Sequence, residues 1–466
     1  MNRSWRYLAF VTILAATFMS VLNTNMIRVA SPSIMSEFGV DVKDLTWVFN
    51  AYILPYSILM PVFGRLGDMY GRKRMFMLGL TTFAAGSILC SMTWTFGSLV
   101  LFRVIQAVGA GALFPNAMAM GTALFPPDQR GRMLGVWGGT AAVGAVVGPA
   151  LGGFLVDFLR WRAVFYVNVP VAVLALVGAA TLLGESPKRP GRFDFAGSIL
   201  LAAGLFSLVM GLTSVGDGRG LVTAGYLAIA LLIIWAFCRV EKGLEQPTVD
   251  LNLFSNPVFV AGTVCGGVHM LTGQATTFLL PLFLAQVQGH PAAVIGLIML
   301  PSACVRIFAS PLGGALSDRL GNRWPVTAGL LIKILTFTLL AFLTPQASPA
   351  YIVAALLING TGAGLIWSPT LSAVMGSAPP ERAGTVAGVF NMLRFVAGIC
   401  GTTVAGLVLS ANFARIDPAR RGPVPGYFES YVMLIAVCAL ALVFVRQLER
   451  TVQTQVPAQQ AEAAGH

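Results

Sequence analysis

Apolar runs recur along nearly the whole chain, and each run is bounded by proline, glycine or charged residues. Most runs are about 17 to 25 residues long, the length at which an α-helix crosses the hydrocarbon core of a bilayer. The short alternation of polar and apolar residues that is typical of membrane β-barrels is absent. Because lipid offers no partners to open backbone groups, the runs predict helices.

The pattern therefore predicts an all-α integral membrane protein with fourteen transmembrane helices. The predicted helices span residues 7–28, 46–65, 75–93, 97–122, 134–157, 163–184, 196–213, 221–238, 257–284, 292–312, 325–343, 350–376, 384–410 and 427–446.

Composition agrees with this class. Of the 466 residues, 56% are hydrophobic and only 10% are charged, whereas soluble domains carry roughly 25% charged residues. The mean hydropathy is +0.78. The net charge of +12 is explained by loop asymmetry rather than by a nucleic-acid partner.

Lysine and arginine concentrate on one side of the predicted bundle. The N-terminus, the even-numbered connections and the tail, counted with Arg65 and Arg446 at the adjoining span ends, hold 18 of them, and the odd-numbered connections hold 7. The richer side is expected to face the cytoplasm. We therefore predict a multi-pass protein of the cell membrane with both termini cytoplasmic.

No pattern of metal ligands or enzymatic chemistry is present. The six cysteines fall singly inside predicted spans and read as small core residues, so no metal or other cofactor is expected. The chain has three histidines and lacks H-E-x-x-H, G-x-S-x-G and the G-x-x-x-x-G-K-[ST] phosphate loop. These absences argue against an enzyme and against ATP-driven transport.

Two loop motifs occur twice. GRLGDMYGRKR from Gly64 matches GALSDRLGNR from Gly314 at an offset of 250, and PPDQRG from Pro126 matches PPERAG from Pro379 at an offset of 253. Two landmarks with nearly the same offset indicate an internal duplication of six helices. Such duplicated halves favour a transporter with a site near the midplane over a channel with a symmetric pore.

The predicted organisation is thus six helices, two inserted helices and six helices. The corresponding segments are an N-terminal half at 1–184, the inserted pair with its linkers at 185–256, a C-terminal half at 257–446 and a cytoplasmic tail at 447–466.

Motifs in both halves resemble the fourteen-helix drug:proton antiporter branch of the major facilitator superfamily. In chain order they are GRLGDMYGRKR, RVIQAVGAG from Arg103, GAVVGPALGG from Gly144, WRAVFYVNVP from Trp161, FLLPLFL from Phe278 and SPLGGALSDRLGNR from Ser310. The resemblance implies secondary transport of small organic molecules by two halves that rock against each other, of the efflux type.

Gating candidates follow from the repeated turns. Asp68 can accept hydrogen bonds from amides at the start of the third helix or pair with a neighbouring arginine such as Arg72, and Asp318 occupies the same place in the second copy. In the fifth helix, glycines including Gly148 form a small-residue face and Pro149 bends the helix. The resemblance implies that this face belongs to the interface that rearranges.

The charged residues in the middle of the predicted spans are all cations. A charge at the bilayer centre costs about 2.5 to 3.5 kcal/mol on insertion scales, so such residues are functional candidates. They are Arg28, Arg103, Arg306, Lys333 and Arg394, and none of the 18 acidic residues lies in mid-span.

The first helix departs from the pattern of the family that it resembles. That family commonly has LDxTIVNVALP there, which aligns with LNTNMIRVASP from Leu22. Asn23 replaces the acid, and Arg28 replaces an asparagine. A group able to bind a cation is lost and a base is gained.

We therefore predict a preference for anionic substrates. The resemblance implies that Arg28, Arg306 and Arg394 face one cavity, where guanidinium groups suit a carboxylate, phosphate or sulfonate. The uncharged candidates in the spans are Asn23, Asn25 and Gln106. Lys333 is expected at the lipid-facing periphery, with its ammonium snorkelling to a headgroup.

The sequence allows two driving forces for transport, the membrane potential and a proton gradient. Outward movement of one negative charge gains about 2.3 kcal/mol per 100 mV. Proton coupling has two candidates: His269, which can titrate near neutral pH, and Arg103 of the RxxQ pattern. The alternatives are a proton-coupled antiporter of cationic or lipophilic drugs and an uptake permease for an organic anion.

Overall fold

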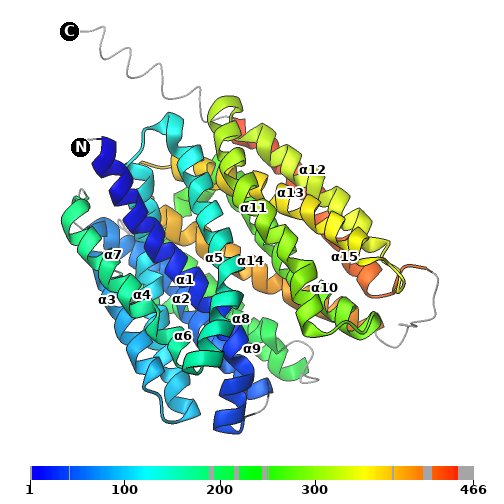
Figure 1. Ribbon diagram of the computed structural model, residues 1–466. Helices are drawn as coiled ribbons and strands as arrows, with labels where there is room; N and C mark the ends of the chain where they lie inside the picture. The colour runs from blue at the N-terminus through cyan, green and yellow to red at the C-terminus, as the bar shows by residue number, and fades with distance from the viewer. Residues whose placement is uncertain are drawn as a thin grey trace.

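The structure is a computed structural model. It describes residues 3–40, 42–186, 188, 194–214, 220–243, 249, 251–379, 382–412 and 422–449. The described residues form helices and no strand, arranged as one bundle (Figure 1). The predicted tail lies outside the described residues from 450 onward, as does much of the linker at 185–194.

Among the described residues, fourteen helical segments are long and apolar enough to cross a membrane, which is the predicted number. The segment predicted as the N-terminal half, called the first half below, contains α1 (Arg3–Phe38), α2 (Val42–Tyr70), α3 (Arg72–Ser91), α4 (Phe96–Ala123), η1 (Pro127–Gln129), α5 (Arg130–Leu159), α6 (Ala163–Tyr166) and α7 (Asn168–Leu182). The inserted pair is α8 (Phe195–Thr213) and α9 (Gly220–Lys242), followed by η2 (Leu251–Ser255). The second half contains α10 (Pro257–Leu282), η3 (Phe283–Val287), α11 (Ala292–Leu320), α12 (Arg323–Ala341), α13 (Pro349–Gly376), α14 (Ala383–Asn412), α15 (Tyr427–Val445) and η6 (Arg446–Glu449).

Several helices are longer than their apolar runs. The first helix was predicted to end at residue 28, but α1 continues to Phe38 through Pro32. Polar residues in its last turns do not stop a helix that has left the hydrocarbon layer, and proline bends a membrane helix without ending it. The sixth span has a break between α6 and α7, because Pro170 cannot donate to the carbonyl of Tyr166.

Two pairs of helices join the halves. α2 packs along α14, and α5 packs along α11, so each half contributes one helix to each pair. The two inserted helices pack on each other, and α8 also contacts α2 and α14. We call the side on which α1 begins and α15 ends the terminal side; the loop charges predict that this side faces the cytoplasm.

The glycine face predicted in the fifth helix has a different neighbour from the one expected. A Cβ added at Gly148 would lie 2.6 Å from the Asn25 Cβ, and one at Gly152 would lie 2.9 Å from the Met26 Cα, both on α1. This face therefore packs inside its own half. The contact of α5 with α11 is made by Gly135 instead, where a Cβ would lie 2.6 Å from the Pro311 Cα.

The α2–α14 crossing is close because glycine occupies the contact. A Cβ added at Gly384 would lie 2.6 Å from both the Gly64 carbonyl oxygen and Asp68 Oδ1. Real side chains do not tolerate such distances, so the two backbones approach each other only without a side chain at this position.

We predict that Gly384→Ala lowers the thermal unfolding temperature of the purified protein, because overpacking at a backbone contact costs about 1–3 kcal/mol. The matched control is Gly97→Ala on α4, where an added Cβ meets nothing within 4 Å. Equal unfolding temperatures for the two variants would show that the α2–α14 contact is not as tight as described.

Candidate functional site

The last turn of α2 carries a carboxylate that joins the two halves. Asp68 is 1% exposed, and it accepts hydrogen bonds from the backbone amides of Gly384 at 3.0 Å and Thr385 at 2.8 Å. The Thr385 hydroxyl donates to it at 2.9 Å, and so does Arg72 Nε. The predicted pairing with Arg72 is confirmed, whereas the amide donors lie at the start of α14 and not of the third helix. The first amides of α14 have no partner inside their own helix.

The second copy of the motif makes the symmetric contact. Asp318, in the last turn of α11, accepts hydrogen bonds from the backbone amides of Gly131 and Arg132, each at 2.8 Å. Ser368 on α13 donates to the Gly131 carbonyl at 2.7 Å. Gly131 and Gly384 hold the same place in the repeated PPDQRG and PPERAG motifs. The duplicated loops therefore meet crosswise, each aspartate capping a helix of the other half.

These contacts close the terminal side of the bundle. A carboxylate at a helix N-terminus is favoured by the helix dipole as well as by its hydrogen bonds, and hydrogen bonds to charged groups contribute about 1.5–3 kcal/mol each. Such contacts must separate when the halves rock apart. Asp68, Arg72 and Asp318 thus have the geometry required of a gate, and their role in gating stays a prediction, as it does for Gly148 and Pro149.

A buried guanidinium lies in the middle of α14. Arg394 is 5% exposed; its Nη1 donates to Asn391 Oδ1 at 2.8 Å, and its Nη2 lies 3.9 Å from the Met270 sulfur. The guanidinium carbon is 3.8 Å from the ring centre of Trp367 on α13. Within the described residues, Arg394 has no carboxylate partner, and both its Nε and the Trp367 indole N–H lack a hydrogen bond.

Further cations of the second half surround a histidine. The His269 ring lies 6.5 Å from that of Trp367, and its Nδ1 is buried without a partner. Lys333, Arg394 and Arg306 are all close enough to interact electrostatically with His269. The structure thus brings the predicted residues Arg306, Arg394 and His269 together around one face of the second half.

Lys333 is not where the sequence placed it. It is 1% exposed, and its ammonium donates to the Thr272 hydroxyl at 2.7 Å, between α12 and α10. The prediction that it snorkels toward lipid headgroups is therefore wrong. Since α12 is apolar around its whole circumference, its sequence alone could not show which face turns inward.

The first half has its own buried network. Arg103 Nε donates to the Val48 carbonyl at 3.0 Å, Arg103 also donates to Gln106, and Gln106 Nε2 donates to the Ser87 hydroxyl at 2.7 Å. The guanidinium of Arg103 lies over the Tyr52 ring at 4.2 Å. These partners give Arg103 and Gln106 a clear packing role, while proton coupling through Arg103 and substrate contact by Gln106 stay predictions.

A stack of aromatic rings leads from this network to the second half. Tyr52 stacks on Tyr56 with ring centres 5.7 Å apart, and Tyr56 meets the edge of Phe395 at 5.3 Å. Phe395 follows Arg394 in the chain. The buried cations of the two halves are therefore linked by packed rings.

The two asparagines of α1 contact neighbouring backbone and helices. Asn23 is fully buried, and its Oδ1 accepts a hydrogen bond from Asn168 Nδ2 at 3.1 Å. Asn25 donates to the Val21 carbonyl one turn earlier at 2.8 Å and packs on Gly148. Substrate contact by either residue stays a prediction.

Arg28 remains open. Its side chain is exposed and has no hydrogen bond or ion pair with any described residue. It lies one turn beyond Thr24, so the two residues share one face of α1. No contact joins Arg28 to Arg306 or Arg394 directly.

Some residues of these sites escaped the sequence reasoning. Thr272 and Met270 contact the buried cations but have no distinguishing pattern in an apolar helix. Gly384 and Gly131 could have been identified from the sequence, because both follow the repeated proline pairs at equal positions. Among the described residues, no group of three histidine, cysteine or acidic side chains could hold a metal ion.

The sequence model of the Major Facilitator Superfamily matches residues 13–402. The chain belongs to the Major Facilitator Superfamily. It is a secondary transporter and a multi-pass membrane protein.

Related superfamily members match this chain over most of its length. The riboflavin transporter RibZ of Clostridioides difficile is 27% identical over 97% of this chain and 100% of its own. The multidrug transporter MdtP of Bacillus subtilis is 31% identical, covering 89% and 77% of the two chains, and the multidrug resistance protein Stp of Mycobacterium tuberculosis is 32% identical, covering 93% and 81%. The crystal structure of the human organic anion transporter MFSD10 shares the fold, with a TM-score of 0.70 at 16% identity over 96% of this chain and all of that one.

For this superfamily member we predict a crossed response in hydrogen–deuterium exchange. Asp68→Ala should speed exchange of the amides at 384 and 385 by about 10- to 100-fold, because their acceptor is lost. Asp318→Ala should speed exchange at 131 and 132 and leave the start of α14 unchanged.

The control for both is Asp157→Ala, which removes an exposed acid from the other end of α5. Uniform acceleration in both gate variants would indicate general destabilisation. Unchanged exchange in both would contradict the gate contacts.

Proposed function

We propose that this transporter exports organic anions that carry a flat aromatic part, from the terminal side to the opposite side. The observation that carries the proposal is Arg394, a buried guanidinium on the face of Trp367 that has no carboxylate to neutralise it among the described residues.

The chemistry of this position suits an anion. A buried charge without a partner is costly, so a ligand that supplies the opposite charge is bound more tightly there than in water. The guanidinium of Arg394 and the indole of Trp367 each offer a free N–H, and a carboxylate or sulfonate has enough lone pairs to accept both. Trp367, Tyr56 and Phe395 offer ring surfaces for the aromatic part of the ligand.

Arg28 and Arg306 extend the positive field. Neither has an ion pair within the described chain, and Arg306 lies in electrostatic range of His269. Cations of one sign around a water-poor site raise the local concentration of anionic substrates. We therefore assign these arginines to the approach and holding of the anion, and Arg394 to its principal contact.

Export agrees with the energetics and with the relatives. Outward movement of an anion gains about 2.3 kcal/mol per elementary charge and 100 mV at an inside-negative potential, so no proton relay is required. Several relatives are named for resistance or export, among them a tetracenomycin C resistance and export protein of Streptomyces glaucescens. Proton coupling through His269 or Arg103 is not needed for this direction.

Proton-coupled export of cationic or lipophilic drugs is the second candidate. The names of MdtP and Stp favour it, since both are multidrug proteins. It would need a group in mid-span that attracts cations. The acidic residues of the described spans lie near helix ends, and Asp68 and Asp318 are already occupied by helix amides.

The decisive experiment compares aromatic carboxylates with aromatic ammonium ions in proteoliposomes. We predict that the wild type moves the carboxylates and that Arg394→Gln loses about 10- to 100-fold in apparent affinity for them, the value of a charged hydrogen bond. Arg394→Lys should recover only part of this loss, because an ammonium keeps the charge and loses the planar fork.

The matched control is Arg239→Gln, which removes one exposed positive charge from α9, far along the chain from this site. Unchanged carboxylate transport by Arg394→Gln, or a wild type that prefers the ammonium ions, would contradict the proposal.

A second prediction concerns Arg28. If it holds the anion, the thermal stabilisation of detergent-purified protein by aromatic carboxylates should fall in Arg28→Gln, and Arg28→Glu should abolish carboxylate transport through charge repulsion. Stabilisation by carboxylates that is indifferent to both changes would leave Arg28 with a structural role only.

A further inference from the structure

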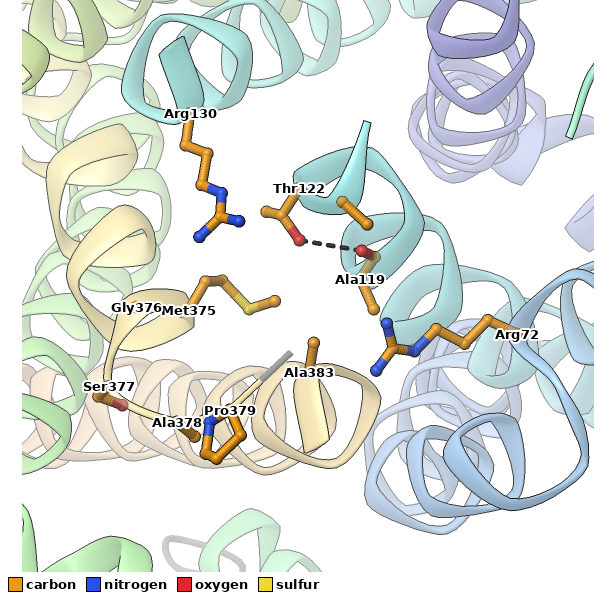
Figure 2. Close-up of a pocket in the computed structure, with 11 residues that line it drawn as sticks. Arg72, Ala119, Thr122, Arg130, Met375, Gly376, Ser377, Ala378, Pro379 and Ala383 are labelled. Carbon is orange, nitrogen blue, oxygen red and sulfur yellow. Dashed lines mark hydrogen bonds between the residues drawn. The ribbon is translucent and has the colours of Figure 1, made fainter. Parts of the chain in front are cut away.

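A polar pocket lies at the terminal side, between the two halves. Its volume is about 410 Å³, within the range of small-molecule sites. Figure 2 is a close-up of this pocket. The lining residues are Arg72, Ala119, Thr122, Ala123, Arg130, Met375, Gly376, Ser377, Ala378, Pro379 and Ala383.

Two guanidinium groups point into this pocket, and none of the described residues that line it is acidic. Arg130, the first residue of α5, extends toward Met375, and Arg72 extends toward Ala383 from the opposite wall (Figure 2). Arg72 also forms an ion pair with Asp68, which is buried and is not among the lining residues. Arg130 has one long hydrogen bond, from its Nε to the Phe125 carbonyl at 3.4 Å, and no ion pair within the described residues.

The gate itself does not require these two cations. The repeat places Asn322 at the position of Arg72 and Ala383 at the position of Arg130. Asp318 nevertheless accepts its two amide hydrogen bonds with Asn322, and not an arginine, four residues later. Arg72 and Arg130 therefore occur in only one copy of the repeated motifs, and both line the same pocket.

We propose that this pocket binds the phosphate group of a small phosphorylated anion and thereby holds the transporter closed on the terminal side. The Nη groups of Arg130 and the edge of Arg72 supply planar, charged donors that match phosphate oxygens. The alanine, proline and methionine side chains of the lining accommodate a small organic part.

The dependence on conformation follows from the lining. Arg72, Thr122 and Arg130 belong to the first half, whereas Met375 and Ala383 belong to the second. When the halves separate at the gate, the two sets of residues move apart and the site no longer exists. A ligand that binds one of two conformations shifts the population toward it, so the phosphate compound acts as an inhibitor from the terminal side.

The test uses glycerol 3-phosphate as the probe and the thermal stability of the full-length protein in phosphatidylcholine nanodiscs as the readout. We expect saturable stabilisation of the wild type, an apparent affinity weaker by about tenfold or more in Arg130→Gln, and partial retention in Arg130→Lys. Arg132→Gln is the matched control: it removes the same charge two residues away, from an exposed side chain that does not line the pocket.

A second arm separates the two sources of a phosphate group. Nanodiscs containing phosphatidylglycerol should stabilise the wild type without added probe only if a lipid headgroup reaches the pocket; stabilisation by the soluble probe alone assigns the site to a free compound. Either result supports a phosphate site, provided that Arg130→Gln removes the effect.

The outcome that overturns the proposal is stabilisation that is absent in the wild type, or equal in Arg130→Gln and Arg132→Gln. Because this readout needs no transported substrate, failure of the anion-export proposal would leave it intact. Conversely, Arg130→Gln should still bind aromatic carboxylates, which keeps the two proposals separable.

Discussion

A charge inside a bilayer needs a compensating partner, and this chain separates its charges by depth. The acids near the gate, Asp68 and Asp318, lie at helix ends where helix amides bind them, whereas Arg103, Arg394 and Lys333 lie deep in the spans. Arg103 is compensated by a carbonyl, an amide and an aromatic ring. Arg394 is left with one amide oxygen, a sulfur and two ring faces, which is why this position calls for an anion from outside the protein.

One helix connects the gate to this site. α14 begins with the amides that bind Asp68, continues through Asn391 and reaches Arg394 after nine or ten residues. At 1.5 Å per residue, this separation is about 15 Å along a continuous helix. A rigid displacement that frees the amides from Asp68 must also move the guanidinium relative to Tyr56 and the first half. Alternating access and ligand contact are thus coupled through the backbone of α14, without a separate relay.

The features that short stretches of sequence determine could be predicted from the sequence. Continuous apolar length predicted all fourteen spans, and the offsets of the loop motifs predicted that Asp68 and Asp318 would hold equivalent positions. Features that depend on tertiary neighbours could not be predicted. Asp68 binds α14 rather than α3, the Gly148 face packs on α1, and Lys333 turns inward, because an apolar helix gives no sign of which neighbours it will meet. The predicted end of α1 was also ten residues too early. Hydropathy shows which residues are apolar enough to lie in the bilayer, and a helix can continue beyond them.

Recognition of negative charge by Arg394 is tested most directly by calorimetric binding of an isosteric pair to the wild-type protein. An aromatic carboxylate and its neutral carboxamide have nearly the same size and ring surface and differ mainly in charge. The account predicts that the carboxylate binds at least about tenfold more tightly, equivalent to about 1.4 kcal/mol. Equal affinities, or tighter binding of the carboxamide, would show that ring packing alone governs recognition and would contradict an anion site in this transporter.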